Sequence, residues 1–272
     1  MDGDVFGGGR SAWLDRAGLL RNVLRQEIVA RQLAQQLPRD ADGLTALDVG
    51  AGQGTQAISL ARRGIQVDAV EPDAQMRAAL TAAVADEGDD VRARVRVLDG
   101  SLDTLSETGR SSYDVVLCHG VLMYLEDTGP ALAALAAKVP EGGLLSVLTR
   151  QAVSLAWRPA QRGDWSGVTA ALEEQRTARA DSRRPAYLNE LGVPAHADDP
   201  ESLAAALTNL GITGHIWHGV RVASDAMPAD APVPSDPELE ALIAAELALG
   251  AREPYRRMAT LFHLVSRRAA LT

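Results

Sequence analysis

An apolar run that leads into regularly spaced glycines constrains the fold of this chain more than any other feature. Residues 45–54 read TALDVGAGQG, an apolar segment with the acidic Asp48 followed by Gly50, Gly52 and Gly54. The apolar part is typical of a buried strand, and glycines let the backbone turn tightly and approach another group closely. The pattern predicts a strand that passes through a turn directly into a helix, as in α/β proteins.

Strands and helices are then expected to alternate along the chain. We expect strands at 66–72, 95–101, 113–122 and 143–149, and helices at 54–63, 73–87 and 129–138. Asp73 is well placed to accept hydrogen bonds from the first backbone N–H groups of the second helix. This alternation predicts a parallel sheet with helices covering both faces.

The two ends of the chain extend this core. Residues 17–37 place apolar side chains at helical spacing, which predicts an amphipathic helix before the sheet. After Arg150 the alternation stops until Pro200, and a segment of this length with helical character indicates an insertion or cap. The pattern then resumes with helices at 201–210 and 238–249 and strands at 212–223 and 257–268.

We therefore predict an α/β fold with a Rossmann-like, seven-stranded, mostly parallel sheet, helices on both faces, an N-terminal helix and an inserted helical cap. The last two strands are expected to form an antiparallel pair. Across the 272 residues the expected parts are an N-terminal helical lid (1–40), a cofactor-binding core (41–150), the cap (151–200) and the C-terminal part of the core (201–272).

Composition and charge exclude several classes of protein. No run of eighteen apolar residues is present, so no membrane span is expected, and the N-terminus lacks a secretory pattern, so we expect a cytoplasmic protein. The single cysteine, Cys118, rules out an intrachain disulfide and a cysteine metal cluster, and no metal is expected. The net charge of −9 argues against a generic nucleic-acid binder. Residues 150–194 nevertheless hold seven arginines against five acidic residues.

Acidic and polar residues at the strand ends indicate a nucleoside site. Glu71 ends the second strand, where an acid can accept hydrogen bonds from both ribose hydroxyls of an adenosine. Dinucleotide-binding loops follow the spacing GxGxxG, whereas this loop reads GxGxG, which favours S-adenosylmethionine (SAM) over NAD. Gly100 and Ser101, at the end of the third strand, are expected near the adenine. The alternatives are an NAD-binding domain, a glycine turn without a ligand and, at 99–101, an ordinary turn.

Other candidate residues lie at the ends of later strands. His119 ends the fourth strand at the carboxyl edge of the sheet, where ligands bind in such folds, although a lone histidine can also be purely structural. Tyr124 and Arg150 lie at strand ends and could hold an acidic acceptor. The arginines of the insertion, among them Arg179, Arg183 and Arg184, could hold such an acceptor or RNA phosphates, or could form a solvated helix face.

Several stretches together resemble the bacterial tRNA 5-carboxymethoxyuridine methyltransferase family, whose members methylate a carboxylate on a modified wobble uridine. The resembling stretches are LRQEI (24–28), LDVGAGQGTQAI (47–58), DAQM (73–76), HGVLMYLEDT (119–128), EGGLLSV (141–147), GVRV (219–222) and REPYRRMATLFHLVSRR (252–268). The chain departs from that family in its insertion, where arginines alternate with acids in place of a lysine-rich run, and in the Glu71-Pro72 pair.

The resemblance implies a SAM site and a catalytic role at that site. The residues that it assigns to the cofactor, together with those of the glycine motif, are Arg25, Asp48, Gly50, Ala51, Gly52, Gly54, Glu71, Pro72, Gly100, Ser101 and His119. His119 is also the nearest candidate for a catalytic base, should the acceptor be a hydroxyl group. S-adenosylhomocysteine would be the product form of the cofactor.

Three functions remain open from the sequence. The first is O-methylation of a carboxylate on an anionic acceptor, which the resemblance implies to be the wobble 5-carboxymethoxyuridine of tRNA. The second is a small-molecule methyltransferase of specialised metabolism. The third is a catalytically silent cofactor-binding module, which the intact Asp48, glycine loop and Glu71 disfavour. The expected partners are accordingly tRNA or an anionic small molecule, with no membrane and no metal.

Overall fold

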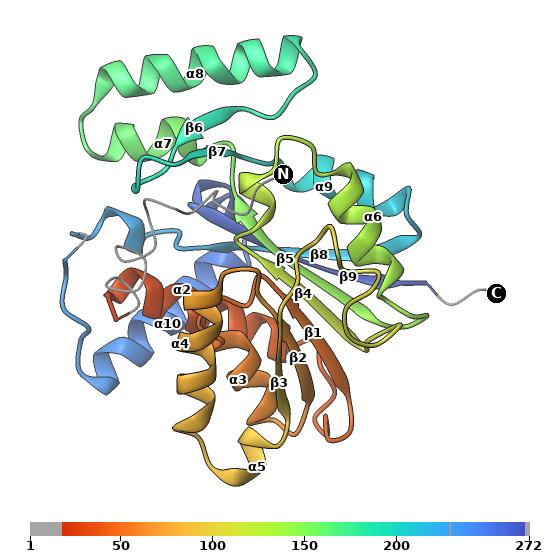
Figure 1. The fold of residues 1–272 in the computed structure, drawn as a ribbon. Helices are drawn as coiled ribbons and strands as arrows, with labels where there is room; N and C mark the ends of the chain where they lie inside the picture. The colour runs from red at the N-terminus through yellow and green to blue at the C-terminus, as the bar shows by residue number, and fades with distance from the viewer. Residues whose placement is uncertain (1–17, 229, 270–272) are drawn as a thin grey trace.

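The fold is a seven-stranded sheet between two layers of helices, seen in a computed structural model that describes residues 18–228 and 230–269 (Figure 1). The strands are β1 (Thr45–Val49), β2 (Gln66–Val70), β3 (Val95–Leu98), β4 (Val115–His119), β5 (Leu144–Arg150), β8 (Ile212–Val220) and β9 (Leu261–Arg268). Their order is β3-β2-β1-β4-β5-β9-β8. β1 to β5 pair in parallel, and β9 runs antiparallel to both β5 and β8. The predicted fold class and antiparallel pair are confirmed.

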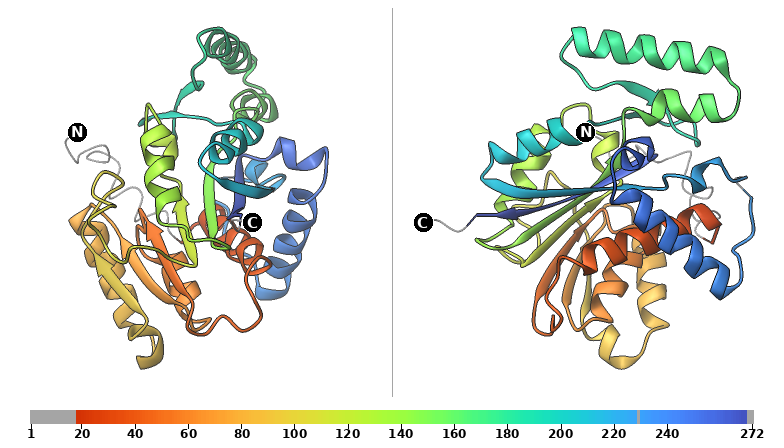
Figure 2. Two further views of the ribbon diagram at one scale, coloured as in Figure 1. Left: turned by 90° about the vertical axis from the view of Figure 1, so that its right-hand side faces the viewer. Right: turned by 180° about the vertical axis from the view of Figure 1, so that it is seen from behind.

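Helices cover the two faces of the sheet as the alternation predicts (Figure 2). One face carries α2 (Leu20–Ala34), α3 (Thr55–Ala61), α4 (Ala74–Ala85) and α10 (Asp236–Gly250), and the other carries α6 (Gly129–Ala137) and α9 (Pro200–Thr208). Asp73 caps α4 as expected, since its carboxylate accepts from the N–H groups of Gln75 and Met76. No helix in the described ranges is long and apolar enough to cross a membrane.

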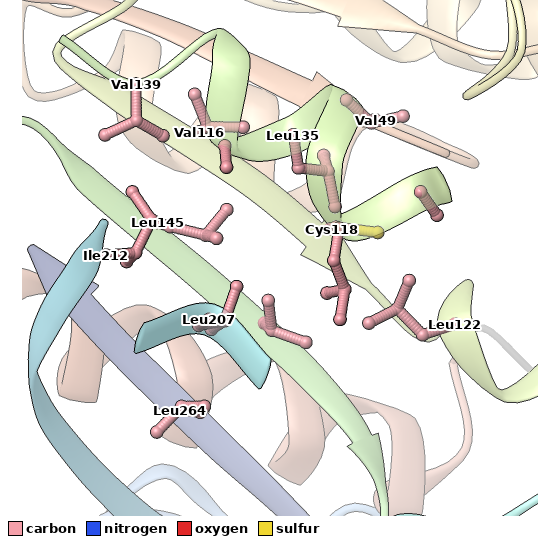
Figure 3. Close-up of a cluster of buried hydrophobic side chains, with 14 of the residues drawn as sticks. Val49, Val116, Cys118, Leu122, Leu135, Val139, Leu145, Leu207, Ile212 and Leu264 are labelled. Carbon is pink, nitrogen blue, oxygen red and sulfur yellow. The ribbon is translucent and has the colours of Figure 1, made fainter. Parts of the chain in front are cut away.

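An apolar core holds the second helical layer against the sheet (Figure 3). Val116 and Cys118 of β4, Leu145 of β5 and Leu264 of β9 point into this core and are completely buried. Because side chains alternate along a strand, the next residues, including His119 and Ser146, point to the opposite face, beneath α2. Cys118 is thus a buried apolar side chain, as expected from its surroundings in the sequence.

The insertion after β5 forms a separate layer above the carboxyl edge of the sheet (Figure 1). It consists of α7 (Ser154–Gln161) and α8 (Trp165–Ala180), which pack on each other, and a small hairpin of β6 (Ala186–Leu188) and β7 (Pro194–His196). The sequence predicts the helical character but not the hairpin. A four-residue helix, α5 (Asp89–Arg92), was also not predicted. The N-terminal residues of the expected lid, 1–17, lie outside the described residues, and α2 represents the remainder of it.

Candidate functional site

The glycine loop turns sharply between β1 and α3. Gly50, Gly52 and Gly54 have φ angles of 72°, 57° and 81°, which side chains with a Cβ rarely adopt. A Cβ on Gly50 would lie 2.4 Å from Val121 Cγ2, so any other residue there would have to displace Val121 and adopt a strained φ. The N–H groups of Gly50 and Ala51 donate to the Val70 carbonyl at 2.8 and 3.1 Å. The loop is thereby fixed against the end of β2.

Two buried carboxylates stand beside this loop. Glu71 accepts from the Gly52 N–H at 2.9 Å and the Asp73 N–H at 3.0 Å, and burial raises its pKa. Each of its oxygens keeps a second lone pair, which leaves capacity for the ribose hydroxyls. Burial, followed by the negative charge of Glu71, raises the pKa of Asp48 to about 7, although the Ala57 N–H donates to it. Asp48 therefore holds the first turn of α3 through the Ala57 N–H, while its burial beside Glu71 disfavours its charged form.

The end of β3 forms the next part of the site. The backbone of Gly100 passes close to Val70, because a Cβ there would lie 3.1 Å from Val70 Cγ1. Ser101 begins a turn in which its N–H donates to Thr104 Oγ1 at 2.9 Å. Pro72 is exposed, and its carbonyl accepts from Arg77. Gly100, Ser101 and Pro72 thus lie near the carboxyl end of β2, and their contact with an adenine stays a prediction.

His119 and Arg25 lie near each other below the cap. His119 ends β4, and its Nε2 lies 2.8 Å from Ser146 Oγ. Its Nδ1 is buried and has no hydrogen-bond partner within the described ranges. Burial, followed by the positive charge of Arg25, lowers the pKa of His119 to about 3. Arg25 itself has its pKa lowered to about 10, mainly by burial and then by Arg221.

These residues fit a SAM molecule. The buried Nδ1 of His119 has no partner among the described residues, and the partly buried guanidinium of Arg25 lies near it. The methionyl end of the cofactor carries an ammonium group and a carboxylate, which match this acceptor and this cation. Glu71 matches the ribose, and the glycine loop allows close approach of the chain between them.

A cavity of about 820 Å³ lies between the sheet edge and the cap, and we call it the arginine cavity. Its walls come from α2, the end of β5, α7, α8, the β6–β7 hairpin and the ends of β8 and β9. Six arginines line it: Arg21, Arg25, Arg150, Arg158, Arg162 and Arg221. Four carboxylates do so as well: Asp164, Glu174, Glu190 and Asp230. The lining is therefore net positive.

Arg158 and Arg221, two of the buried arginines there, are neutralised by carboxylates, whereas Arg150 is not. Arg158 pairs with Asp225 and Glu190, and Arg221 pairs with Asp225. Arg150 is 8% exposed, forms no ion pair with any described residue, and its Nε lacks a hydrogen-bond partner there. Its guanidinium lies 5.2 Å from the centre of the Tyr187 ring. Burial, followed by Arg158, lowers the pKa of Arg150 to about 10.

The structure brings together only some of the predicted acceptor residues. Tyr124 and Arg150 line the arginine cavity. Arg183 is outside the cavity lining and pairs with Glu174 at 2.5 Å. Arg184 pairs with Asp198 at 3.1 Å and donates to the Leu122 carbonyl. Arg179 is exposed near the end of α8. The charge run in the sequence carried no information about which arginines face inward.

Sequence reasoning missed several lining residues. Arg158 and Tyr187 come from the insertion, where no periodic pattern marks the inner face. Arg221 belongs to the GVRV stretch, whose resemblance assigns no role to its arginine. It has a φ of 60°, an uncommon conformation for arginine that was not apparent from the sequence. Among the described residues, no group of three His, Cys, Asp or Glu side chains could hold a metal ion.

Comparisons with known proteins indicate the class of enzyme. Residues 47–145 match the model of a methyltransferase domain. The chain is 29% identical over 187 residues to the tRNA 5-carboxymethoxyuridine methyltransferase of Escherichia coli K12, covering 64% of this chain and 68% of that protein. It is 30% identical over 165 residues to the ubiquinone biosynthesis O-methyltransferase of Caulobacter vibrioides, covering 53% of this chain and 63% of that protein.

Solved structures share the fold at low sequence identity. A SAM-dependent methyltransferase from Thermotoga maritima superposes with a TM-score of 0.60 at 14% identity, covering 97% of this chain and 99% of that one. A 1,6-didemethyltoxoflavin-N1-methyltransferase from Burkholderia thailandensis, solved with S-adenosylhomocysteine, has a TM-score of 0.55 at 15% identity, covering 98% and 85%. Together with the domain match and the relatives, the glycine loop and its acids identify this chain as a SAM-dependent methyltransferase with a Rossmann-like fold.

Proposed function

We propose that this enzyme transfers a methyl group to a carboxylate of an anionic acceptor bound in the arginine cavity, forming a methyl ester. The observation that carries the proposal is Arg150, a buried guanidinium at the carboxyl end of β5 with no carboxylate partner among the described residues. A buried cation is costly unless an anion compensates it. A carboxylate on the acceptor would supply that anion.

The residues of the site suit an acceptor that is already ionised. When bound, SAM supplies an electrophilic methyl group, so that a carboxylate oxygen forms the new O–C bond while the S–C bond breaks and its electron pair stays on sulfur. A carboxylate with an ordinary pKa of about 4 needs no general base at neutral pH. His119, with a pKa of about 3, is too weak a base to activate a hydroxyl group at pH 7.

Each remaining residue then positions a reactant. Glu71 would accept from the ribose hydroxyls, Arg25 would pair with the methionyl carboxylate, and Arg150 would hold the acceptor carboxylate. Tyr124 and Tyr187 offer aromatic surface in the same cavity. The cap formed by α7, α8 and the β6–β7 hairpin would exclude water from the two reactants.

The acceptor that we favour is the carboxylate of 5-carboxymethoxyuridine in tRNA. The Escherichia coli relative bears the name of that activity, and several particular stretches of this chain resemble that family. A cavity of about 820 Å³ is of the size that binds small ligands and has room for one modified nucleoside. The rest of an anticodon loop would lie outside it, along the cap.

A small anionic metabolite is the second candidate, and the surface of α8 favours it. Two arginines outside the cavity lining are engaged by neighbouring acids, Arg176 by Glu173 at 2.6 Å and Arg183 by Glu174 at 2.5 Å. Such pairs leave less positive charge for RNA phosphates than a lysine-rich run would. The net charge of −9 also disfavours binding of RNA and therefore favours a small acceptor.

One labelling experiment tests the proposal. The purified enzyme is incubated with SAM carrying a radioactive methyl group and with an extract from the source organism after deletion of the gene. Mild alkali hydrolyses a methyl ester and releases volatile methanol, whereas methyl ethers and methylamines survive it. We expect the enzyme-dependent label to become volatile. Label that stays bound after alkali treatment would contradict carboxylate methylation.

Fractionation of the same reaction by size separates the two acceptors. Label in the tRNA fraction, located by mass spectrometry of its nucleosides, supports the first candidate, and label in the low-molecular-mass fraction supports the second. If tRNA is the acceptor, replacing Arg179, Arg183 and Arg184 with alanine should weaken its binding and flatten the salt dependence, with S-adenosylhomocysteine affinity unchanged. Full activity of that variant on tRNA would show that these arginines take no part.

A further inference from the structure

A buried chain of polar side chains crosses from the sheet to α2. His119 Nε2 lies 2.8 Å from Ser146 Oγ, and Ser146 Oγ lies 2.7 Å from His263 Nε2. His263 Nδ1 lies 2.9 Å from Gln32 Oε1, and Gln32 Nε2 donates to the Gly219 carbonyl at 3.2 Å. Ser146, His263 and Gln32 are at most 1% exposed. We call His119, Ser146, His263 and Gln32 the polar relay.

The far end of the polar relay fixes the position of every proton in it. The Gly219 carbonyl can only accept, so the Gln32 amide must direct its N–H there and its oxygen toward His263. His263 therefore carries its proton on Nδ1 and offers a lone pair at Nε2. The single proton of the Ser146 hydroxyl is donated to that lone pair. Ser146 then accepts from His119, which must carry its proton on Nε2.

The near end of the polar relay is consequently a lone pair on His119 Nδ1. That atom is buried and has no partner within the described part of the chain, although nearly all buried polar atoms in folded proteins are paired. His119 ends β4 beside β1, at the point where the strand order reverses and ligands bind in such sheets. Arg25, seven residues before Gln32 on the same face of α2, is its charged neighbour. The lone pair thus faces the cofactor site.

We propose that Ser146, His263 and Gln32 are positioning residues that hold His119 neutral, with its proton on Nε2, so that Nδ1 accepts an N–H from the methionyl ammonium group of the cofactor. A protonated imidazole would offer a second N–H there and repel a cationic ligand. The proposal concerns the cofactor end of the site and holds whichever acceptor is methylated.

Nitrogen NMR tests the proton positions directly. The chain has five histidines, so the ring nitrogens of the ¹⁵N-labelled protein can be resolved by long-range ¹H–¹⁵N correlation and assigned with His119→Gln and His263→Gln. At pH 7, without ligand, we expect His119 protonated on Nε2 alone and His263 on Nδ1 alone. S-adenosylhomocysteine should shift the Nδ1 resonance of His119. A His119 protonated on Nδ1, or on both nitrogens, would overturn the proposal.

Variants of His263 link the proton position to binding. His263→Phe removes the acceptor for Ser146, whose hydroxyl can then donate to His119 and move the imidazole proton to Nδ1. We expect S-adenosylhomocysteine to bind about tenfold more weakly by calorimetry, the size of one hydrogen bond to a charged group. His263→Gln keeps an acceptor oxygen, so it should restore both the His119 proton position and most of the affinity.

A second histidine–serine pair supplies the matched control. His215 Nδ1 lies 2.7 Å from Ser266 Oγ across β8 and β9, at the opposite end of these strands from the site. His215→Phe should leave the His119 signals and the affinity unchanged. Should His263→Phe fail to fold, Ser146→Ala replaces it, and we expect His119 to populate both neutral forms with weaker binding. If Ser146→Ala binds S-adenosylhomocysteine as tightly as wild type does, and its His119 is protonated on Nε2 alone, the role of the polar relay is also refuted.

Discussion

Replacement of Arg150 by methionine should stabilise the protein and impair its function at the same time. Burial lowers the pKa of Arg150 from its ordinary value above 12 to about 10, which corresponds to about 3 kcal/mol at about 1.4 kcal/mol for each unit of pKa. Methionine keeps an unbranched apolar chain of similar length without the charge. The lost contact with the Tyr187 ring offsets about 1–2 kcal/mol of the gain.

The expected net stabilisation is therefore about 1–2 kcal/mol, or a rise in Tm of about 2–8 °C for a chain of this size. Catalysis should change in the opposite direction. Loss of a charge-assisted hydrogen bond of about 1.5–3 kcal/mol to the acceptor carboxylate should lower kcat/KM about 10–150-fold. The affinity for S-adenosylhomocysteine should remain that of the wild type. Stability is measured by calorimetry of the ligand-free protein, and kcat/KM with the acceptor that the labelling experiment identifies.

Arg176→Met is the matched control, because Arg176 is an exposed arginine of the cap whose partner, Glu173, lies three residues earlier. Such a surface pair contributes less than about 0.5 kcal/mol, so neither Tm nor kcat/KM should change measurably. A destabilised Arg150→Met protein with unchanged kcat/KM would refute the reasoning, since Arg150 would then be a structural residue and the cavity would not bind an anion through it.

Three further predictions concern the cofactor end of the site. Glu71→Ala should weaken S-adenosylhomocysteine binding in calorimetry by about 1–3 kcal/mol, because buried ribose hydroxyls lose their acceptor, and unchanged affinity would remove Glu71 from the site. Arg25→Ala should weaken the same ligand at least about tenfold. The Tm of the ligand-free protein should not fall, because burial lowers the pKa of Arg25 and so disfavours its charge in the absence of a ligand; equal affinity would make Arg25 structural. The pKa of Asp48 is raised to about 7 in the folded state, so the stability that its protonated form contributes is complete below pH 4 and is lost as pH rises through 7. Between pH 4 and 8 the free energies of unfolding of wild type and Asp48→Asn should diverge by on the order of 4 kcal/mol in favour of the variant. Parallel pH curves for the two proteins would disprove the pKa shift.

The fold could be predicted from the sequence because its strands are continuous apolar runs with glycine or polar residues at their ends. β1, β2, β4 and β5 are buried almost throughout, which is the reason for those runs. The β6–β7 hairpin was missed because its three-residue strands are too short for a period to appear, and they are partly exposed. α5 has a single turn and buries no side chain.

The cofactor site was more predictable than the acceptor site for a physical reason. Glu71 and the glycine loop occupy the ends of adjacent strands, so their proximity follows from the parallel sheet alone. The arginine cavity joins Arg25 of α2, the neighbouring Arg150 and Arg158 of β5 and α7, and Arg221, which directly follows β8, so it gathers residues from three distant parts of the sequence. Their convergence depends on how the cap folds back over β5. The carboxylates that neutralise Arg183 and Arg184 depend on it too.

The pH dependence of kcat/KM tests most directly the central claim that these residues position an acceptor that is already ionised. The measurement runs from pH 5.5 to 9 at saturating SAM, with the identified acceptor, for wild type and for Asp48→Asn, which removes the group with a pKa of about 7. An acceptor carboxyl with a pKa of about 4 and a His119 with a pKa of about 3 stay in one form over this range. We expect a flat profile in Asp48→Asn, with any step in wild type near pH 7 due to Asp48. A tenfold rise in kcat/KM for each pH unit in both proteins would show that a proton must be removed from the acceptor, and would contradict the claim.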